Sequence, residues 1–235
     1  MTDTMPVILE LGPKGKKVVA TAWDWPGLER NGKTEEDALA KLEAYLPRYA
    51  KVAGRARMKD EFATQKSLSV IERYDGVGST DFWGISFASC DLDRQPISPE
   101  DWERRLALVQ ACWAEFDAIA ARVSPEMRKG PRGGGRDRDE IINHVFGNER
   151  EWARKIGVET PQGAMLTPDG LKMHRHRYIA ALRAYHAEGR PAGRTWTLSY
   201  LLRHTAYHVM DHAWEMEDKD LTGVEDQELN GSAGK

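Results

Sequence analysis

Cysteine is nearly absent from this chain of 235 residues, which contains only Cys90 and Cys112. Two cysteines cannot build the multi-bridge framework that stabilises small secreted proteins. Cys112 falls within an apolar helical pattern, so we expect a buried thiol of the core rather than a nucleophile. The first residues also lack the basic and apolar segments of a secretory signal. These absences together favour a reducing, cytoplasmic location.

Long apolar runs and an excess of one charge are missing as well. No run approaches the roughly 18 apolar residues of a membrane span, so no membrane insertion is expected. The 34 basic and 37 acidic residues nearly cancel, to a formal net charge of -3, and they are interspersed. Such a balance gives no broad attraction to nucleic acid or to an anionic membrane. Neither a dinucleotide-binding glycine fingerprint nor a nucleophile elbow is present.

The first 75 residues mix strand and helix patterns. Short β-rich runs at 7–11, 17–23 and 68–74 predict three strands. The tripeptide at 30–32 (Arg-Asn-Gly) is typical of a turn. Thr34 precedes three acidic residues and predicts a helix start, and Pro47 predicts that this helix kinks or ends nearby. The expected order is strand, strand, helix, strand.

Residues 76–97 are predicted to form a connector, because glycines interrupt them while Phe82, Trp83 and Phe87 make them apolar. So apolar a segment does not stay freely solvated, and we expect it to pack down through its aromatic side chains.

Helical signals dominate from Ser98 onwards, where a capping serine, a proline and two acids stand together. Four amphipathic helices follow, at about 98–123, 137–156, 167–187 and 197–218. The polar tail at 221–235 is predicted to be disordered. The sequence therefore predicts an α+β protein: a small αβ module (1–75), the connector (76–97), and an up-down four-helix bundle (98–220).

Three of the seven histidines stand four residues apart near the C-terminal end of the chain. These are His204, His208 and His212, and residues at this spacing are neighbours on a helix. His208 and His212 lie about 40° apart at the centre of the apolar face, with His204 on its flank. His144 falls on the apolar stripe of the second long helix. The pattern predicts that three imidazoles meet inside the bundle.

A single core histidine is usually satisfied by a carbonyl or a carboxylate. Two on one apolar face would each need a polar partner in a place that offers few, whereas one metal ion satisfies both. We therefore predict His144, His208 and His212 as ligands of a divalent metal. Glu215 is placed to orient a ligand histidine through its other ring nitrogen, and His204 to lie beside the ligands. The remaining histidines, among arginines on the third helix, are expected on a solvated face.

The segment 207–212 (Tyr-His-Val-Met-Asp-His), preceded by the inward histidine of 142–146 (Ile-Asn-His-Val-Phe), resembles the DinB/YfiT superfamily of four-helix-bundle metalloproteins. The resemblance covers roughly residues 98–220, including the entry to the second long helix at 133–139. It implies metal ligands at His144, His208 and His212, a zinc or nickel ion, and a thiol-dependent transferase or isomerase activity. Paired bundles in that family imply a homodimer.

Residues 25–28 (Trp-Pro-Gly-Leu) and 32–39 (Gly-Lys-Thr-Glu-Glu-Asp-Ala-Leu) resemble the HicB antitoxin fold, a degenerate relative of the ribonuclease H architecture. This resemblance implies that the N-terminal module can bind a protein partner. No helix-turn-helix or basic recognition helix follows the module, so DNA binding is not expected. The carboxylates needed for RNA cleavage are not recognisable either.

Three hypotheses remain open at this point. In the first, the bundle is a metal-dependent enzyme, a thiol S-transferase or a hydrolase, acting on a small molecule with a low-molecular-weight thiol as cosubstrate. The glycine-rich loop 130–135, flanked by arginines and lysine, would then hold an anionic thiol; a flexible, solvated connection is the alternative for that loop. In the second, the chain is a regulatory, partner-binding protein without catalysis. In the third, the metal is purely structural.

Overall fold

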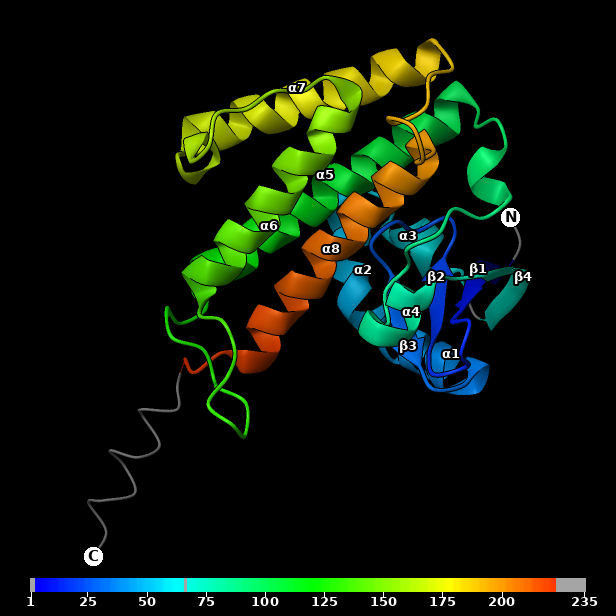
Figure 1. The fold of residues 1–235 in the computed structure, drawn as a ribbon, viewed down its shortest axis with the longest axis horizontal. Coiled ribbons are helices and arrows are strands. Elements are labelled where there is room, and N and C mark those ends of the chain that lie inside the picture. Colours follow the sequence, from blue (N-terminus) through cyan, green and yellow to red (C-terminus); the bar gives the residue numbers. More distant parts are fainter. Residues whose placement is uncertain (1–2, 66, 223–235) are drawn as a thin grey trace, which may run out of the picture.

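The computed structural model describes residues 3–65 and 67–222, and Figure 1 shows an αβ part packed beside a set of long helices. The αβ part contains β1 (Thr4–Leu11), β2 (Val18–Ala22), β3 (Glu29–Gly32), α1 (Glu35–Ala44), α2 (Leu46–Arg55), α3 (Lys59–Ala63) and β4 (Ser67–Asp75). The connection contains α4 (Gly78–Trp83) and the short 3-10 turn η1 (Leu92–Arg94). The helical part contains α5 (Pro99–Arg122), α6 (Arg138–Ala153), η2 (Arg154–Ile156), η3 (Ala164–Leu166), α7 (Pro168–Ala187) and α8 (Leu198–Lys219). The α+β class is confirmed.

The four strands form one mixed sheet in the order β3-β2-β1-β4. β1 pairs with β2 in the antiparallel sense and with β4 in the parallel sense, and α1 to α3 form the crossover between them. The turn predicted at 30–32 is wrong, because Glu29–Gly32 pairs with β2 as an edge strand. This strand has no apolar alternation, so the ladder with β2, rather than the local sequence, determines its conformation.

Local signals set the helix ends where they were predicted. The Thr34 hydroxyl accepts a hydrogen bond from the Asp37 N–H (3.2 Å) at the start of α1. α1 ends at Ala44, and Pro47 lies in the first turn of α2, as its missing N–H requires. The three capping residues of α5, α7 and α8 each accept a bond from the third residue beyond them; they are Ser98, Thr167 and Thr197.

Long helices pack together around α8. Phe116 of α5 meets Phe146 of α6, and the Val123 carbonyl just after α5 accepts from Arg138 at the start of α6, so these two helices are antiparallel. Trp152 of α6 meets His204 of α8 and His144 meets His212, so α6 is antiparallel to α8 as well. α5 and α8 consequently run in the same direction, and α7 lies across one end of the group (Figure 1). Nearly every residue of α8 from Leu198 to Met216 is buried, because the αβ part covers the side that the helices leave open.

Of the aromatic side chains predicted to pack the connection down, Phe87 is partly buried and its ring lies 6.4 Å from that of His204, but Phe82 and Trp83 do not pack. Phe82 and Trp83 are 74% and 64% exposed, whereas polar groups of the same segment are buried. Thr80 and Ser86 donate hydroxyl hydrogen bonds of 2.5 and 2.7 Å to the buried carboxylate of Glu10 in β1. A buried carboxylate needs donors, so the segment is held by hydrogen bonds rather than by apolar contact.

Of the tail predicted to be disordered, only Leu221 and Thr222 are described, and the Leu221 N–H donates to the Ser124 hydroxyl (3.0 Å). The prediction for 223–235 lies outside the described residues. Within the described ranges, no helix is both long enough and apolar enough to cross a bilayer.

Candidate metal centre

Two antiparallel helices bring three histidines together. His144 of α6 and His208 and His212 of α8 form a group in which one ligand atom from each ring lies within 4.8 Å of the other two. The Nε2 atoms of His144 and His208 are 3.2 Å apart, and the three ring centroids are separated by 4.6 to 5.0 Å. All three side chains are partly buried. Such a group can hold a metal ion.

The donor atoms fit an ion better than they fit one another. Two nitrogens bound to one tetrahedral zinc ion are about 3.4 Å apart, close to the observed separation of the His144 and His208 nitrogens. Without an ion, the two facing Nε2 atoms can make only one hydrogen bond between them, whereas an ion takes the lone pair of each.

Burial keeps two of the imidazoles neutral. Burial, with His212 and Arg136 adding to it, lowers the pKa of His144 to about 4. Burial also lowers the pKa of His208 well below its usual value, and His212 is the next contributor. Both rings are therefore uncharged at pH 7, which is the form that binds metal.

A carboxylate fixes the third ring. Glu215 lies one turn beyond His212, and its Oε2 atom is 2.6 Å from the Nδ1 atom of that ring. Lys219 donates to the other oxygen at 2.6 Å. The hydrogen bond from His212 is the main reason that the pKa of Glu215 falls to about 2. Because a carboxylate only accepts hydrogen bonds, the Nδ1 atom of His212 carries the proton. The Nε2 atom is then unprotonated, and its lone pair can bind a metal ion.

His204 lies beside this group and not within it. Its ring contacts Trp152, Trp196 and Tyr200 at centroid distances of 4.7, 5.3 and 5.2 Å. Burial lowers its pKa to about 3. Trp152 also meets His208 edge to face at 4.9 Å, so one indole separates the buried His204 from the candidate ligands.

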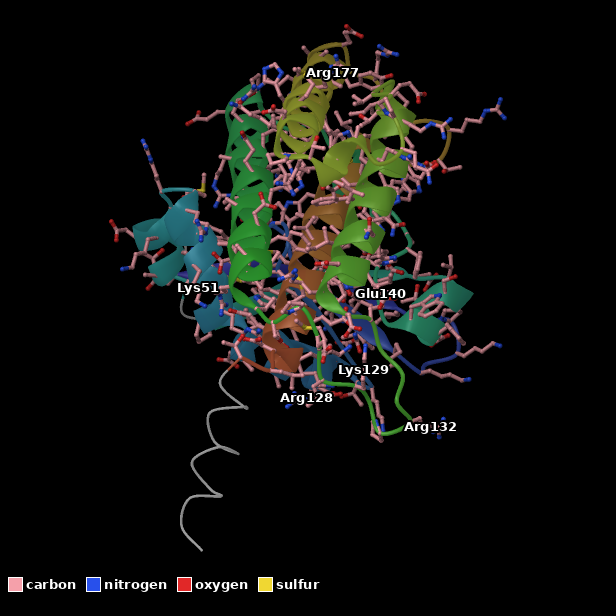
Figure 2. The ribbon with its side chains drawn as sticks, turned by 90° about the vertical axis from the view of Figure 1, so that its left-hand side faces the viewer. Lys51, Arg128, Lys129, Arg132, Glu140 and Arg177 are labelled. Carbon is pink, nitrogen blue, oxygen red and sulfur yellow. The ribbon has the colours of Figure 1, made fainter. Side chains whose placement is uncertain are left out.

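A basic loop adjoins the three histidines. Lys129 donates to the Gly135 carbonyl (3.2 Å) and to the Asp137 carboxylate (2.6 Å), which ties the loop to the start of α6. Figure 2 shows Arg128, Lys129 and Arg132 at this end of the helices. Arg136 is near enough for its charge to lower the pKa of His144 and of His208. The loop thus adds positive charge beside the candidate metal centre.

The histidines of α7 divide in a way that the sequence prediction missed. His176 is exposed as expected, but His174 is only 1% exposed. Its Nδ1 atom lies 2.8 Å from the Thr160 hydroxyl and its Nε2 atom 3.4 Å from the buried Glu149 carboxylate. Its spacing of four residues from Tyr178, on the apolar stripe, was the available signal for burial.

A buried ionic network on the far side of α8 was also missed. Arg203 donates to the Asp93 carboxylate at 2.8 Å and lies 4.0 Å from Glu29 in β3. Burial raises the pKa of Glu29 to about 7, although Arg203 and the Thr21 hydroxyl oppose this. The signal lay in α8 itself, whose apolar residues occur on all sides, as in a fully buried helix.

Comparison with family models, with curated proteins and with solved structures finds no match for this chain.

Proposed function

We propose that His144, His208 and His212 bind one divalent metal ion, zinc or nickel, and that the helical part is a metal-dependent enzyme. One observation carries the proposal: three ring nitrogens from two helices converge within 4.8 Å, and two of them face each other at 3.2 Å. Neutral imidazoles suit either metal, and three protein ligands leave a further coordination position, as in catalytic sites.

An ion held by these three rings would supply Lewis acidity, which would favour the deprotonated form of a thiol or a water at neutral pH. The chain's own residues hold and orient the ligands. Glu215 keeps the proton of His212 on Nδ1, and Lys219 keeps that carboxylate charged. Trp152 packs on His208 and excludes water from one side of it.

The charge beside the centre favours an anionic cosubstrate. Arg136 and Lys129 of the adjoining loop would attract a thiol that carries a carboxylate, and they would stabilise its thiolate form. A thiol S-transferase is therefore favoured over a hydrolase.

The test is the metal content of untagged protein, measured by plasma mass spectrometry on wild type, His144→Ala and His208→Ala. We expect about one ion per chain in the wild type and loss of the ion in both variants. A site with three protein ligands loses most of its affinity for the metal when one ligand is removed. His176→Ala, which removes an exposed histidine of α7, is the control and keeps its metal. A wild type that binds no metal, even after reconstitution, contradicts the proposal.

Thiol-dependent turnover separates catalysis from a structural ion. An enzyme consumes an anionic thiol faster when the metal is loaded, and it loses this rate in His208→Ala. A structural ion instead raises the free energy of unfolding without turnover or thiol binding.

A partner-binding role is the second candidate, with the surface for the partner on α4 in the connection that follows the αβ part. The exposed pair Phe82 and Trp83, whose rings meet edge to face at 4.6 Å, favours it. If a second copy covers this pair, Trp83→Ser shifts a homodimer to monomer in light scattering and leaves the metal content unchanged. A wild type that is monomeric at high concentration rules out this self-association.

A further inference from the structure

A polar cavity lies where the αβ part, the connection and the start of α5 meet. It has a volume of about 340 Å³, at the lower end of the range for small-molecule sites. Its walls come from the segment after β2, from α3, from the residues around η1 and from the first turns of α5. Arg105 on its wall is about 16 Å along α5 from Phe116, which meets Phe146 of α6 beside His144. The cavity is therefore separate from the candidate metal centre.

Arg105 places a buried cation without hydrogen bonds on the wall of this cavity. Its side chain is only 6% exposed, and none of its nitrogen atoms makes a hydrogen bond to any of the described residues. Only Nη1 is completely enclosed, so Nε and Nη2 keep accessible surface. The nearest acid is Asp24, whose Oδ1 atom lies 3.7 Å from Nη2, which is too far for a hydrogen bond. A buried guanidinium in this state is costly, so a ligand that accepts from it removes the cost.

Asp24 presents the complementary anion. Its side chain is 45% exposed, and within the described part of the chain its carboxylate accepts no hydrogen bond. Arg104 donates to the backbone carbonyl of Asp24 (2.6 Å) rather than to the carboxylate. Burial raises the pKa of Asp24 although Arg105 opposes this, and burial lowers the pKa of Arg105 although Asp24 opposes this. Each charge therefore lacks a close partner that would offset its burial.

The other charged groups of the wall leave a negative remainder. Arg104 is paired with Glu61, and the Asp101 carboxylate accepts from the Ser98 hydroxyl (2.8 Å). Asp101 is near enough for its charge to raise the pKa of Asp24 further. The wall thus carries the carboxylates of Asp24, Glu61 and Asp101 against the guanidinium groups of Arg104 and Arg105. A ligand with more positive than negative charge complements this balance.

We propose that this cavity binds a basic α-amino acid. The α-carboxylate of the ligand accepts from Nε and Nη2 of Arg105, and its α-ammonium donates to the Asp24 carboxylate. Because these two protein groups are 3.7 Å apart, the opposite charges of the ligand must also be close together. They are so in an α-amino acid, whereas a longer chain separates them in an ω-amino acid. The side-chain cation meets Asp101, and its methylenes lie on Pro96 and Ile97.

The probe is L-lysine, titrated calorimetrically into the full chain beside three analogues. Lysinamide lacks the carboxylate and Nα-acetyl-lysine lacks the α-ammonium. Lysine is expected to bind at least about tenfold more tightly than either, because each has lost a charged group that meets a charged partner. Norleucine keeps both α-groups and lacks the side-chain cation. It is expected to bind about two- to fivefold more weakly than lysine, because Asp101 is exposed.

Two variants locate the lysine. Arg105→Met removes the guanidinium and keeps an aliphatic chain beside the Trp23 ring, and Asp24→Asn keeps the shape and removes the charge. Each is expected to weaken lysine binding about tenfold or more. Asp117→Asn is the matched control, because Asp117 is 44% exposed, pairs with Arg175 and does not line this cavity. If Arg105→Met does not fold, the decision rests on Asp24→Asn at its half-exposed position.

His208→Ala distinguishes this cavity from the metal centre, because a metal ion also binds amino acids. Lysine affinity that is unchanged in His208→Ala supports the proposal, and its loss there overturns it. Equal binding of lysine and lysinamide, unchanged affinity in Asp24→Asn, or no binding up to about 10 mM also overturns it. Norleucine that binds more tightly than lysine overturns the choice of a basic side chain.

Discussion

At the scale of single residues, the candidate metal centre depends on which hydrogen-bond partner each imidazole nitrogen has. The Nδ1 atom of His212 bonds to Glu215, whereas the buried Nδ1 of His208 has no partner among the described residues and its Nε2 faces His144. Groups behind the ligands set the ring tautomer and so determine which atom faces the ion.

Glu215→Gln is expected to lower metal affinity about 10- to 100-fold, because the amide no longer holds the Nδ1 proton of His212 as a charged acceptor. Competition with a fluorescent chelator measures this affinity. Glu217→Gln is the control: Glu217 lies on the same helix but pairs with Arg48. An unchanged affinity in Glu215→Gln would remove Glu215 from the centre.

Glu29 is expected to make the free energy of unfolding fall with rising pH. Its pKa is raised from 4.5 to about 7 by burial, so the folded state binds the proton more tightly than the unfolded state. The stabilisation is complete below about pH 4.5 and is lost as the pH rises through 7. It amounts to about 3 kcal/mol.

Urea unfolding of wild type and Glu29→Gln at pH 4.5 to 7.5 measures this effect. Groups common to both proteins cancel in the difference between them. The wild type should lose stability relative to the variant across this window, and a constant difference would show that Glu29 does not titrate there.

At the scale of elements, α8 contributes side chains to most of the sites described above. It supplies two candidate metal ligands on one side and Arg203 on another. Its position depends on packing by α5, α6 and the αβ part, while its start depends on the local cap at Thr197.

Thr197→Ala is expected to lower the free energy of unfolding by about 1 kcal/mol, because the Tyr200 N–H loses its partner at 3.0 Å. Thermal or urea unfolding measures the change. Thr195→Ala, an exposed position two residues earlier, should have almost no effect. Equal losses in both variants would show that the cap does not stabilise α8.

At the scale of the whole molecule, the αβ part and the helices share one continuous hydrophobic core. The core runs from Met5 and Leu9 in β1 to Trp214 and Met216 at the end of α8. Calorimetry is therefore expected to show one unfolding transition, with equal calorimetric and van't Hoff enthalpies. Two separated transitions would show that the αβ and helical parts unfold independently.

Arg203 joins α8 by charge to Asp93 in the connection and, at 4.0 Å, to Glu29 in the αβ part. Arg203→Ala leaves the fully buried Asp93 carboxylate without its cation, and we expect a loss of about 3 to 5 kcal/mol in the free energy of unfolding. Arg183→Ala breaks an exposed pair with Glu103 and should cost at most about 1 kcal/mol. Similar losses in both variants would contradict a special role for the buried pair.

Interactions within a few residues were readable from the sequence. Ser98, Thr167 and Thr197 mark helix starts because a cap acts on the first turn alone. His208 and His212 share a face because the helical period alone places them there. The α+β class and the four long helices follow from the same local patterns.

Contacts between distant residues were decided only by the tertiary structure. β3 forms because the backbone of β2 pairs with it. His174 is buried among contacts from other segments, where Glu149 and Thr160 lie beside its ring. His144 and His208 are 64 residues apart in the sequence, and their contact depends on how α6 and α8 pack. Local periodicity states which side of a helix is apolar, but only packing determines what each side meets.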